Sequence, residues 1–321
     1  MSWMVTGGAG YIGAHVVHAL IAADSEVVVV DDLSTGSAAR VPEGVPLVRV
    51  DVRDPAEVAA AVARHRPTGI IHLAARKDVA ESTLHPLCYY RDNLDGLRSV
   101  LSAVIAHGVP HVLFSSSAAV YGTPPDPGPI AETAQTVPEN AYGRTKLVGE
   151  WLLRDAAASA GFRWTALRYF NVAGAAAPAL RDTGLTNLVP KLLLAARTGS
   201  AATVHGGDYP TRDGSAIRDY VHVRDVAEAH VHAALALSGG VLSADVLNVG
   251  RGEGVSVLEM IDAVSRTVGP LPYLVGPRRT GDPAEVVAGV GEISARLGWT
   301  ARFGLDDIVR SAAGDWSLAT V

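Results

Sequence analysis

The glycine-rich segment near the N-terminus constrains the fold of this chain most strongly. The short apolar run Met1–Thr6 leads into Gly7–Gly13, where glycine recurs at every third position, and an apolar helix is expected over His15–Ala22. A second β-rich run, Glu26–Asp31, ends in an acid. Strand, glycine turn, helix, strand and acid is the order of a dinucleotide-binding unit, in which glycines permit close approach to a pyrophosphate and the acid holds a ribose hydroxyl. Because the Asp31 carboxylate would repel a 2′-phosphate, the sequence favours NAD over NADP.

Strand-like apolar runs recur along the chain, and helical stretches separate them. The expected strands are Pro46–Val50, Gly69–Leu73, His111–Ser115, Trp164–Tyr169 and Val246–Val249, and the expected helices are Pro55–His65, Asp92–His107 and Ala141–Ala160. Alternation of this kind is typical of a parallel sheet with right-handed crossovers. We therefore predict an α/β fold with a doubly wound parallel sheet of the Rossmann type.

The pattern changes beyond Phe170. Residues 172–216 are rich in Gly, Pro, Asp and Thr and contain one clear helix, Val189–Arg197, which indicates a second lobe built from irregular segments. We expect the nucleotide-binding domain to span residues 1–171, with a return segment near 219–248, and a smaller C-terminal α/β lobe to span 172–321. Ligands of such sheets bind at the carboxyl ends of the strands, so the second lobe should close over that edge.

Composition limits the class of protein. The 321 residues carry a net charge of -6 and no basic run, which argues against nucleic acid as a partner. The single cysteine, Cys88, permits no internal disulfide and fits a reducing compartment. We find no basic leader and no apolar segment near ~20 residues, so we expect a cytoplasmic protein with no membrane contact. His107 and His111 have HxxxH spacing, but Gly108 and Pro110 deny them a common helix, and no metal site is predicted.

Tyr142 and Lys146 stand four residues apart in a helix-compatible segment, so their side chains should converge on one face. A cation beside the phenol favours the phenolate, which makes the pair a candidate general acid/base. Lysine is rare here: Lys77, Lys146 and Lys191 are the only ones, so this lysine is not background usage. The competing interpretation is an ordinary surface tyrosine and lysine on a helix.

Other polar residues follow predicted strands. Ser115–Ser117 comes after an apolar run, Asn93 stands near the start of a long helix, and Lys77 follows another strand. A serine run after a strand is commonly turn chemistry. Ser117, however, precedes Tyr142 by only a loop, and its hydroxyl could hold the same substrate oxygen.

These residues resemble those of the extended short-chain dehydrogenase/reductases and, within them, of the UDP-glucose (UDP-galactose) 4-epimerases. The resemblance runs almost end to end. Its motifs are Thr6–Gly13, Asp31–Ser34, Asp51–Asp54, His72–Lys77, Ser115–Gly122, Tyr142–Lys146, Arg168–Asn171, Asp208–Thr211, Arg218–Val223 and Pro277–Asp282.

The resemblance implies an NAD-dependent epimerase that inverts C4 of a UDP-hexose through a 4-keto sugar, and we expect a homodimer. It implies Tyr142 as acid/base, Lys146 as its modulator and Ser117 as the hydroxyl that shares the sugar O4. NAD would be bound by Gly7, Gly10, Tyr11, Ile12, Gly13, Asp31, Asp51, Val52, Lys77, Asn93, Tyr142 and Lys146. The UDP-sugar would be bound by Ser117, Tyr142, Asn171, Asn187, Leu188, Thr203, His205, Arg218, Arg279 and Asp282.

The chain departs from the family pattern at several positions. His205 stands where phenylalanine is usual against the uracil, Ala141 replaces a proline, Gly289 replaces an acid, and the segment between Gly174 and Asn187 is short. None of these positions touches the acid/base set, so they put the sugar in doubt and not the reaction type.

Three alternatives stay open. A 4,6-dehydratase or uronate decarboxylase should carry an acid after the serines, where Ala118-Ala119 stands, and a non-catalytic NAD-binding regulator would have no reason to retain Ser117, Tyr142 and Lys146 together. The strongest alternative is a 4-epimerase of another nucleotide sugar, such as UDP-GlcNAc/UDP-GalNAc or UDP-glucuronate. Val286 falls where galactose-restricted relatives place a tyrosine that closes the sugar pocket, which predicts that UDP-N-acetylglucosamine is at least a secondary substrate.

Overall fold

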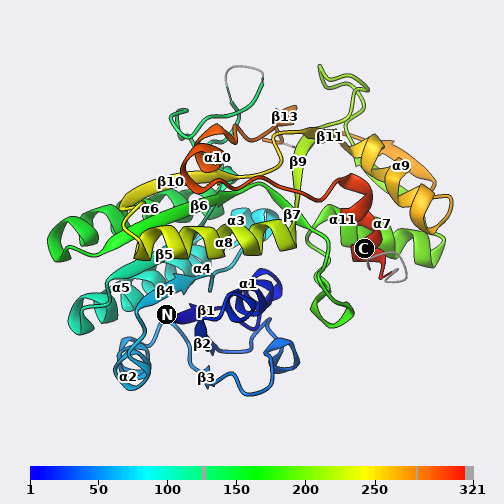
Figure 1. The fold of residues 1–321 in the computed structure, drawn as a ribbon. Helices are drawn as coiled ribbons and strands as arrows, with labels where there is room; N and C mark the ends of the chain where they lie inside the picture. The colour runs from blue at the N-terminus through cyan, green and yellow to red at the C-terminus, as the bar shows by residue number, and fades with distance from the viewer. Residues whose placement is uncertain (125–127, 280, 315–321) are drawn as a thin grey trace.

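A computed structural model of the chain describes residues 1–124, 128–279 and 281–314 (Figure 1). Its centre is a seven-stranded sheet in the order β3-β2-β1-β4-β5-β6-β10, in which every neighbouring pair is parallel. The strands are β1 (Ser2–Thr6), β2 (Glu26–Asp31), β3 (Leu47–Arg49), β4 (Gly69–His72), β5 (His111–Ser117), β6 (Arg163–Tyr169) and β10 (Ala244–Val249). The predicted doubly wound parallel sheet is confirmed.

Helices cover both faces of this sheet, because the strands are apolar on both sides. One face packs against α1 (Tyr11–Ala22) and α8 (Val223–Ser238), and the other packs against α2 (Pro55–His65), α5 (Gly96–His107) and α6 (Ala141–Ala160). Neighbouring strand residues alternate between the two cores: Trp3 and Val5 face the first, and Met4 faces the second. The sheet is thus buried on both sides, and its strand ends are left to form the site.

Local sequence explains where the main helices begin and end. Helix α2 begins after Asp54, whose carboxylate accepts hydrogen bonds from the backbone N–H groups of Ala56 and Glu57, and Pro55 occupies its first position. Helix α6 begins after Asn140, whose side chain accepts from Gly143 N, and it ends at Gly161 in the left-handed region. The predicted bounds of both helices match the observed ones.

One predicted helix is divided. The chain from Asp92 to His107 was expected as a single helix, but residues Arg91–Asp95 form a π-helical turn before α5 begins at Gly96. Two short helices, α3 (Val79–Leu84) and α4 (Pro86–Tyr90), lead into that turn. Asn93 lies in this π-helical turn.

The second lobe is built from short strands and three helices that pack together. A four-stranded sheet contains β11 (Gly254–Ser256), β9 (Ile217–His222), β13 (Glu285–Val286) and β7 (Asn171–Ala173), and β8 (Ala202–His205) pairs with β12 (Tyr273–Gly276). Helices α7 (Leu188–Thr198), α9 (Val257–Val268) and α11 (Leu305–Ala313) share one core, and α10 (Gly291–Leu297) lies near α8 and β10. Figure 1 shows this lobe beside the large sheet, on the side of β7 and β9.

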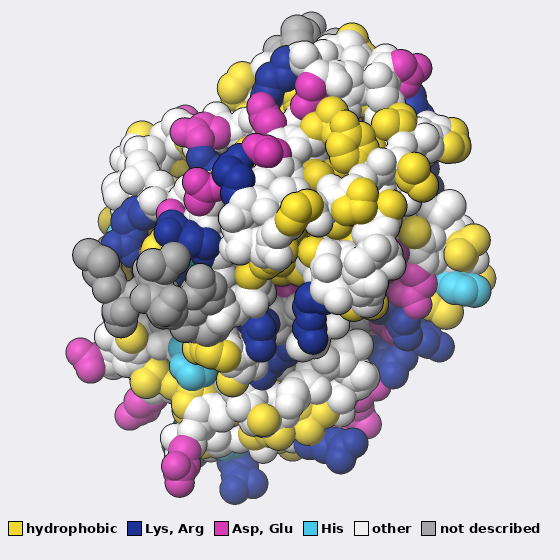
Figure 2. Space-filling view, turned by 90° about the vertical axis from the view of Figure 1, so that its right-hand side faces the viewer, with side chains coloured by type: hydrophobic (Ala, Val, Ile, Leu, Met, Phe, Trp, Pro, Cys, Tyr) yellow, Lys and Arg dark blue, Asp and Glu magenta, His cyan; other side chains and the backbone are white. Residues whose placement is uncertain are grey.

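The chain passes between the two lobes more than once. It leaves the large sheet after β6, and it returns with α8, which packs on α1, and with β10, which pairs with β6. β9, at the start of the predicted return segment, belongs instead to the small sheet. The division at residue 171 stays a prediction. In Figure 2, which views the side of α7, α9 and α11, basic side chains gather in the recess between the two halves.

Candidate active site

The glycine turn lies where β1 ends, at the point where the strand order reverses. Gly7 has φ +72°, and a Cβ on it would lie 2.7 Å from the backbone nitrogen of Ala74, just beyond β4. A Cβ on Gly13 would lie 2.1 Å from the carbonyl oxygen of Gly7. The turn therefore packs against its own helix and against the neighbouring strand end, and only glycine permits both approaches.

The N-terminus of α1 is open to an anion. Gly10 is its N-cap with no side-chain cap, and the first turn contains no acidic residue. The first N–H groups of a helix have no partner within the helix, so a pyrophosphate would satisfy them. The phenol of Tyr11 does not turn this way: it donates to the carbonyl of Gly174 at 2.6 Å. Ile12 packs partly buried against the core of the first sheet face, so both residues can offer only backbone to a cofactor.

Asp31 at the end of β2 is fixed beside the turn. Its Oδ2 accepts from the N–H of Ala9 at 2.9 Å, and its Oδ1 accepts from the N–H of Leu33 at 2.8 Å. Burial raises the pKa of this carboxyl, and the two backbone N–H groups lower it. Each oxygen can accept a further hydrogen bond, which suits a carboxylate that holds a ribose hydroxyl.

Asp51 and Val52 follow β3 on the same edge of the sheet. The Asp51 carboxylate accepts from Arg53, which lowers the pKa of Asp51, and Arg53 also pairs with Asp92 at 2.7 Å. Val52 packs closely on Gly96 at the start of α5. These contacts place the predicted adenine residues next to the π-helical turn.

Asn93 joins three segments. Its Oδ1 accepts from the N–H of Arg76 at 2.8 Å, and its Nδ2 donates to the carbonyl of Arg76 at 3.1 Å and to Thr145 Oγ1 at 2.9 Å. The Asn93 amide is therefore engaged within the protein and holds the loop after β4 against α6. Lys77 lies exposed in that loop.

Tyr142, Lys146 and Ser117 come together at the carboxyl ends of β5 and β6. Lys146 is 3% exposed, and its Nζ donates to the carbonyl of Ser115 at 2.7 Å. The same nitrogen lies 5.8 Å from the centre of the Tyr142 ring. Ser117, at the end of β5, contacts the phenol of half-buried Tyr142. Tyr142 and Lys146 thus lie on one face of α6, as their spacing predicts, and the Ser117 hydroxyl lies beside them at the end of β5.

Burial drives both members of the pair toward neutrality. Burial raises the pKa of the Tyr142 phenol, and the contact with Ser117 partly offsets that rise. Burial also lowers the pKa of Lys146 to about 7, and the Coulomb interaction with Glu150 opposes that fall. A general acid/base site requires a group whose pKa lies near the working pH.

The predicted substrate residues come from the small sheets and from α7. Asn171 follows β6 in β7 and pairs in register with Tyr220 on β9. Asn187 is the N-cap of α7 and donates to Asp182 at 2.6 Å, and Leu188 begins that helix, half-buried. Thr203 is exposed in β8. All these positions belong to the second lobe.

Arg218 and Asp282 form an ion pair across the second lobe, between β9 and the chain before β13. The carbonyl of Arg279 accepts from Asp282 N at 3.2 Å, and the Arg279 side chain is exposed. His205 at the end of β8 interacts with Arg279 and Asp282, and burial lowers its pKa. The structure brings these four residues together; Thr280 of the same motif lies outside the described residues.

Sequence reasoning missed the charged network behind Lys146. Glu150 is 1% exposed, and both of its oxygens accept from the guanidinium of Arg168, at 2.9 and 2.7 Å. Ser116 Oγ donates to the same carboxylate at 2.5 Å. The signal was present, because positions 142, 146 and 150 are spaced four apart on one helix face, but a lone glutamate in a helix usually faces solvent.

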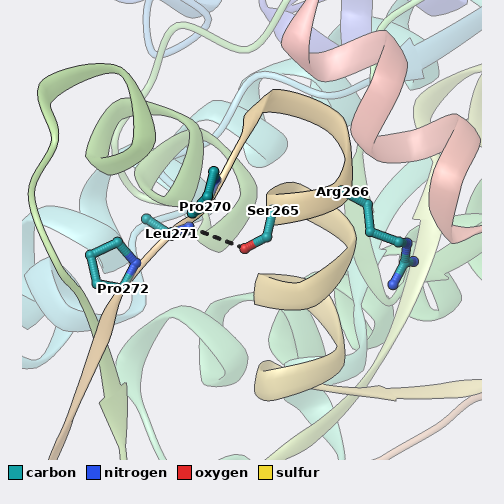
Figure 3. Close-up of a pocket in the computed structure, with 5 residues that line it drawn as sticks. All are labelled: Ser265, Arg266, Pro270, Leu271 and Pro272. Atoms are coloured by element: carbon teal, nitrogen blue, oxygen red, sulfur yellow. Dashed lines mark hydrogen bonds between the residues drawn. The ribbon is translucent and has the colours of Figure 1, made fainter.

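An open hollow on the second lobe is a different feature. It is lined by Ser265, Arg266, Pro270, Leu271 and Pro272, and the N–H of Leu271 donates to Ser265 Oγ at 3.2 Å (Figure 3). The Arg266 side chain points away from the prolines and pairs with Asp262 and Asp306. This hollow gathers none of the predicted site residues.

The described helices include none with the length and apolarity to cross a membrane.

Comparisons with known proteins agree with this geometry. A UDP-glucose 4-epimerase from Azospirillum brasilense is 46% identical over 96% of this chain and 90% of its own length. The crystal structure of a UDP-glucose-4-epimerase from Stenotrophomonas maltophila with bound NAD and formylated UDP-arabinopyranose superposes with a TM-score of 0.93, at 41% identity over 99% of this chain and 98% of that one. A UDP-glucose 4-epimerase from Brucella ovis in complex with NAD gives a TM-score of 0.93 at 37% identity, over 98% of each chain. Residues 3–250 match the NAD dependent epimerase/dehydratase family, and the chain belongs to that family.

Proposed function

We propose that this protein interconverts UDP-glucose and UDP-galactose by inverting C4 of the hexose with NAD bound. The observation that carries the proposal is the convergence of Ser117, Tyr142 and Lys146 at the carboxyl edge of the sheet, beside a glycine turn built for a dinucleotide. A hydroxyl, a phenol and a lysine side by side can move a proton at a secondary alcohol.

The chain's residues fit NAD. The open N-terminus of α1 suits the pyrophosphate, the Asp31 carboxylate suits the adenosine ribose, and Asp51 with Val52 forms the rim for the adenine. We assign Lys77 and Lys146 to the nicotinamide end. Bound there, NAD would supply a reversible hydride acceptor for the sugar C4, so the epimerisation involves no net oxidation.

Tyr142 takes the proton from the sugar 4-hydroxyl and later returns it to the same oxygen. Ser117 holds that oxygen beside the phenol and shares the hydrogen bond. Lys146 is held by the carbonyl of Ser115, and in its ammonium form it stabilises the phenolate. The reaction therefore needs one proton, which passes from the sugar 4-oxygen to Tyr142 and back.

The second lobe binds the UDP portion firmly. Arg218 and Arg279 present guanidinium groups that match phosphate oxygens, and His205 offers a flat ring for the base. Asp282 pairs with Arg218 and so orients it for the diphosphate. The remaining contacts of this lobe with the UDP-sugar would come from Asn171, Asn187, Leu188 and Thr203. A tightly held diphosphate leaves the hexose free to turn over between the two hydride transfers.

The direct test is incubation of the purified protein with UDP-galactose and separation of the products by chromatography. We expect UDP-glucose to appear until both sugars reach equilibrium, with no added reductant or oxidant. UDP-glucuronate serves as the comparison substrate and should be turned over far more slowly. Unchanged UDP-galactose from protein that contains NAD would overturn the proposal.

A second candidate activity is epimerisation of UDP-N-acetylglucosamine. Val286 on β13 pairs in register with Arg218 and packs, half-buried, against a small cluster that includes Phe170 and Leu147. Valine leaves room that a larger side chain would fill, and a 2-acetamido group needs room to turn with the ring. We expect measurable turnover of UDP-N-acetylglucosamine in the wild type and its loss in Val286→Tyr, with UDP-galactose turnover retained. Equal use of the acetamido sugar by both proteins would show that Val286 is only a packing residue.

We further propose that the protein is a homodimer of the cytoplasm. Large apolar side chains are exposed on neighbouring helices: Leu84 on α3, Leu87 on α4 and Trp151 on α6. Two copies of such a surface can cover each other about a twofold axis.

Light scattering should give twice the 33.3 kDa of the chain. Trp151→Glu should halve that mass, whereas Leu274→Glu on the exposed strand β12 should not. Cell fractionation tests the location.

A further inference from the structure

The strongest feature outside the assigned site is the buried ion pair between Glu150 and Arg168. Glu150 is 1% exposed and Arg168 is 5% exposed. Arg168 Nη1 also donates to the Tyr121 hydroxyl at 2.9 Å, and that hydroxyl donates to Asn248 at 2.7 Å. A pair this deep in the protein is not needed for solubility and gives little net stability, because desolvation offsets its Coulomb attraction.

Strand β5 and helix α6 meet in a matched series of contacts. Ser117 contacts Tyr142, the Ser115 carbonyl accepts from Lys146, and the Ser116 hydroxyl donates to Glu150. Each serine of the run thus engages one residue of the helix face that carries the acid/base pair. Ser116 and Glu150 complete the series, and both are buried.

We propose that Glu150, fixed by Arg168 and Ser116, is a positioning residue that sets the electrostatic potential at Lys146 and Tyr142. The inference rests on the proposed function. Glu150 lies one helical turn beyond Lys146, within reach of a direct Coulomb interaction. Arg168 cancels much of its charge, so the three groups together hold about one net positive charge when Lys146 is protonated.

Within the part of the chain that the structure describes, the other ionisable groups near Lys146 leave Glu150 as the acid that acts on it. Burial, and to a smaller extent the nearby Lys146 ammonium, lowers the pKa of His72 on β4 to about 3, so His72 is neutral. Tyr169 on β6 bonds through its hydroxyl to His230 on α8, and burial raises the pKa of its phenol and keeps it protonated. The acids on the helices that contact α6 are paired with arginines: Glu81 with Arg76, Asp92 with Arg53, Arg76 and Arg91, and Asp95 with Arg98. His111 stands at the opposite end of β5.

Two substitutions should shift the pH profile in opposite directions. Glu150→Gln removes a negative charge, so the potential becomes more positive and the pKa of every nearby group falls. Arg168→Met removes a positive charge and leaves Glu150 unopposed, so those pKa values rise. The limbs of kcat/KM against pH for UDP-galactose should move to lower pH in Glu150→Gln and to higher pH in Arg168→Met, each by about one unit.

The controls separate charge from packing. Arg168→Lys keeps the charge and should restore the wild-type profile. Asp225→Asn alters a buried carboxylate in the first turn of α8, on the other face of the sheet from α6, that accepts from the backbone N–H groups of Arg302 and Phe303; it should lower Tm without moving either limb. If Arg168→Met does not fold, the shift of Glu150→Gln against these two controls still decides the question.

Each outcome has one meaning. Opposite shifts support the assignment, and so does an acid shift in Glu150→Gln with an unchanged Arg168→Lys profile. Profiles that stay fixed while Tm falls would show that the pair serves packing alone. Absence of turnover in the wild type at every pH would instead remove the proposed function.

Discussion

At the scale of single residues, the Tyr142 hydroxyl is the atom on which the proposed chemistry depends. Tyr142→Phe removes that proton carrier and leaves the ring that packs beside Lys146. Loss of a general acid/base costs roughly 10²–10⁴-fold in rate, so we expect turnover of UDP-galactose to fall by that factor while bound NAD is unchanged. Chromatography of the sugars and of NAD released on denaturation measures both. A variant that keeps more than a tenth of the wild-type rate would contradict the role.

The sequence predicted the relative placement of these side chains because helix spacing carries spatial information, and their roles stay a proposal. Tyr142 and Lys146 were placed on one face by their separation, and Ser117 was placed nearby by the end of its strand. The partner of Lys146 could not be predicted, because it is a backbone carbonyl, that of Ser115. Nor could the pairing of Glu150 with Arg168, since residues on α6 and β6 meet only through the fold.

At the scale of elements, long periodic segments were predictable and short ones were not. Helices α2 and α6 have their predicted bounds, since capping residues and apolar periodicity agree there. The π-helical turn of Arg91–Asp95 was missed, because periodicity does not report one extra residue in a turn. Strands β7, β9, β11 and β13 were missed as a sheet because they are short and come from distant parts of the chain.

The junction of β1 and α1 allows a test of the glycine turn. In a helix, alanine is usually more stable than glycine by about 1 kcal/mol, yet a Cβ on Gly13 would lie 2.1 Å from the carbonyl oxygen of Gly7. The clash outweighs the propensity, so Gly13→Ala should lower both Tm and NAD content. Gly291 at the start of α10 has open space around its Cβ position, and Gly291→Ala should leave both unchanged. Equal behaviour of the two variants would argue against a tight turn.

At the scale of the whole molecule, buried histidines tie the first helix to the second lobe. The N–H of Ala176, on the crossover from the large sheet, donates to His15 Nε2 on α1 at 3.0 Å. The N–H of the preceding residue, Ala175, donates to Ser311 Oγ on α11, and that hydroxyl also bonds to His222 Nε2. The crossover chain is thus held between the helix of the glycine turn and the last helix, which fixes the second lobe over the strand ends.

These contacts require neutral imidazoles. His15 Nε2 accepts a hydrogen bond from the backbone N–H of Ala176. His222 Nδ1 likewise accepts one from the backbone N–H of Arg224, at 3.0 Å. A proton on either nitrogen would set two donors against each other. Burial lowers the pKa of His15 and His230 to about 4, and that of His72 and His222 to about 3, from an ordinary value of 6.5.

This set of histidines predicts a steep loss of stability in mild acid. Between pH 6.5 and about 4, these four histidines bind protons in the unfolded chain but not in the folded chain. The free energy of unfolding therefore decreases as the pH is lowered, by about 1.4 kcal/mol per pH unit for each histidine. Above pH 6.5 they add no pH dependence. Buried carboxyls with raised pKa values, such as Asp31, Asp219 and Asp225, oppose the loss between their ordinary pKa of 3.8 and their raised values, because the folded chain binds protons there before the unfolded chain does.

Urea unfolding measured at intervals from pH 8 to pH 4 tests this prediction. The wild type should be flat above pH 6.5 and should weaken sharply below it. His15→Gln should be less stable at pH 7, because its bond to Ala176 is disturbed, yet its stability should fall less steeply in acid, since one of the four titrating groups is gone. His107→Gln alters an exposed histidine at the end of α5 and should keep the wild-type slope. A wild-type stability that stays constant down to pH 5 would mean that these imidazoles gain protons without leaving their partners.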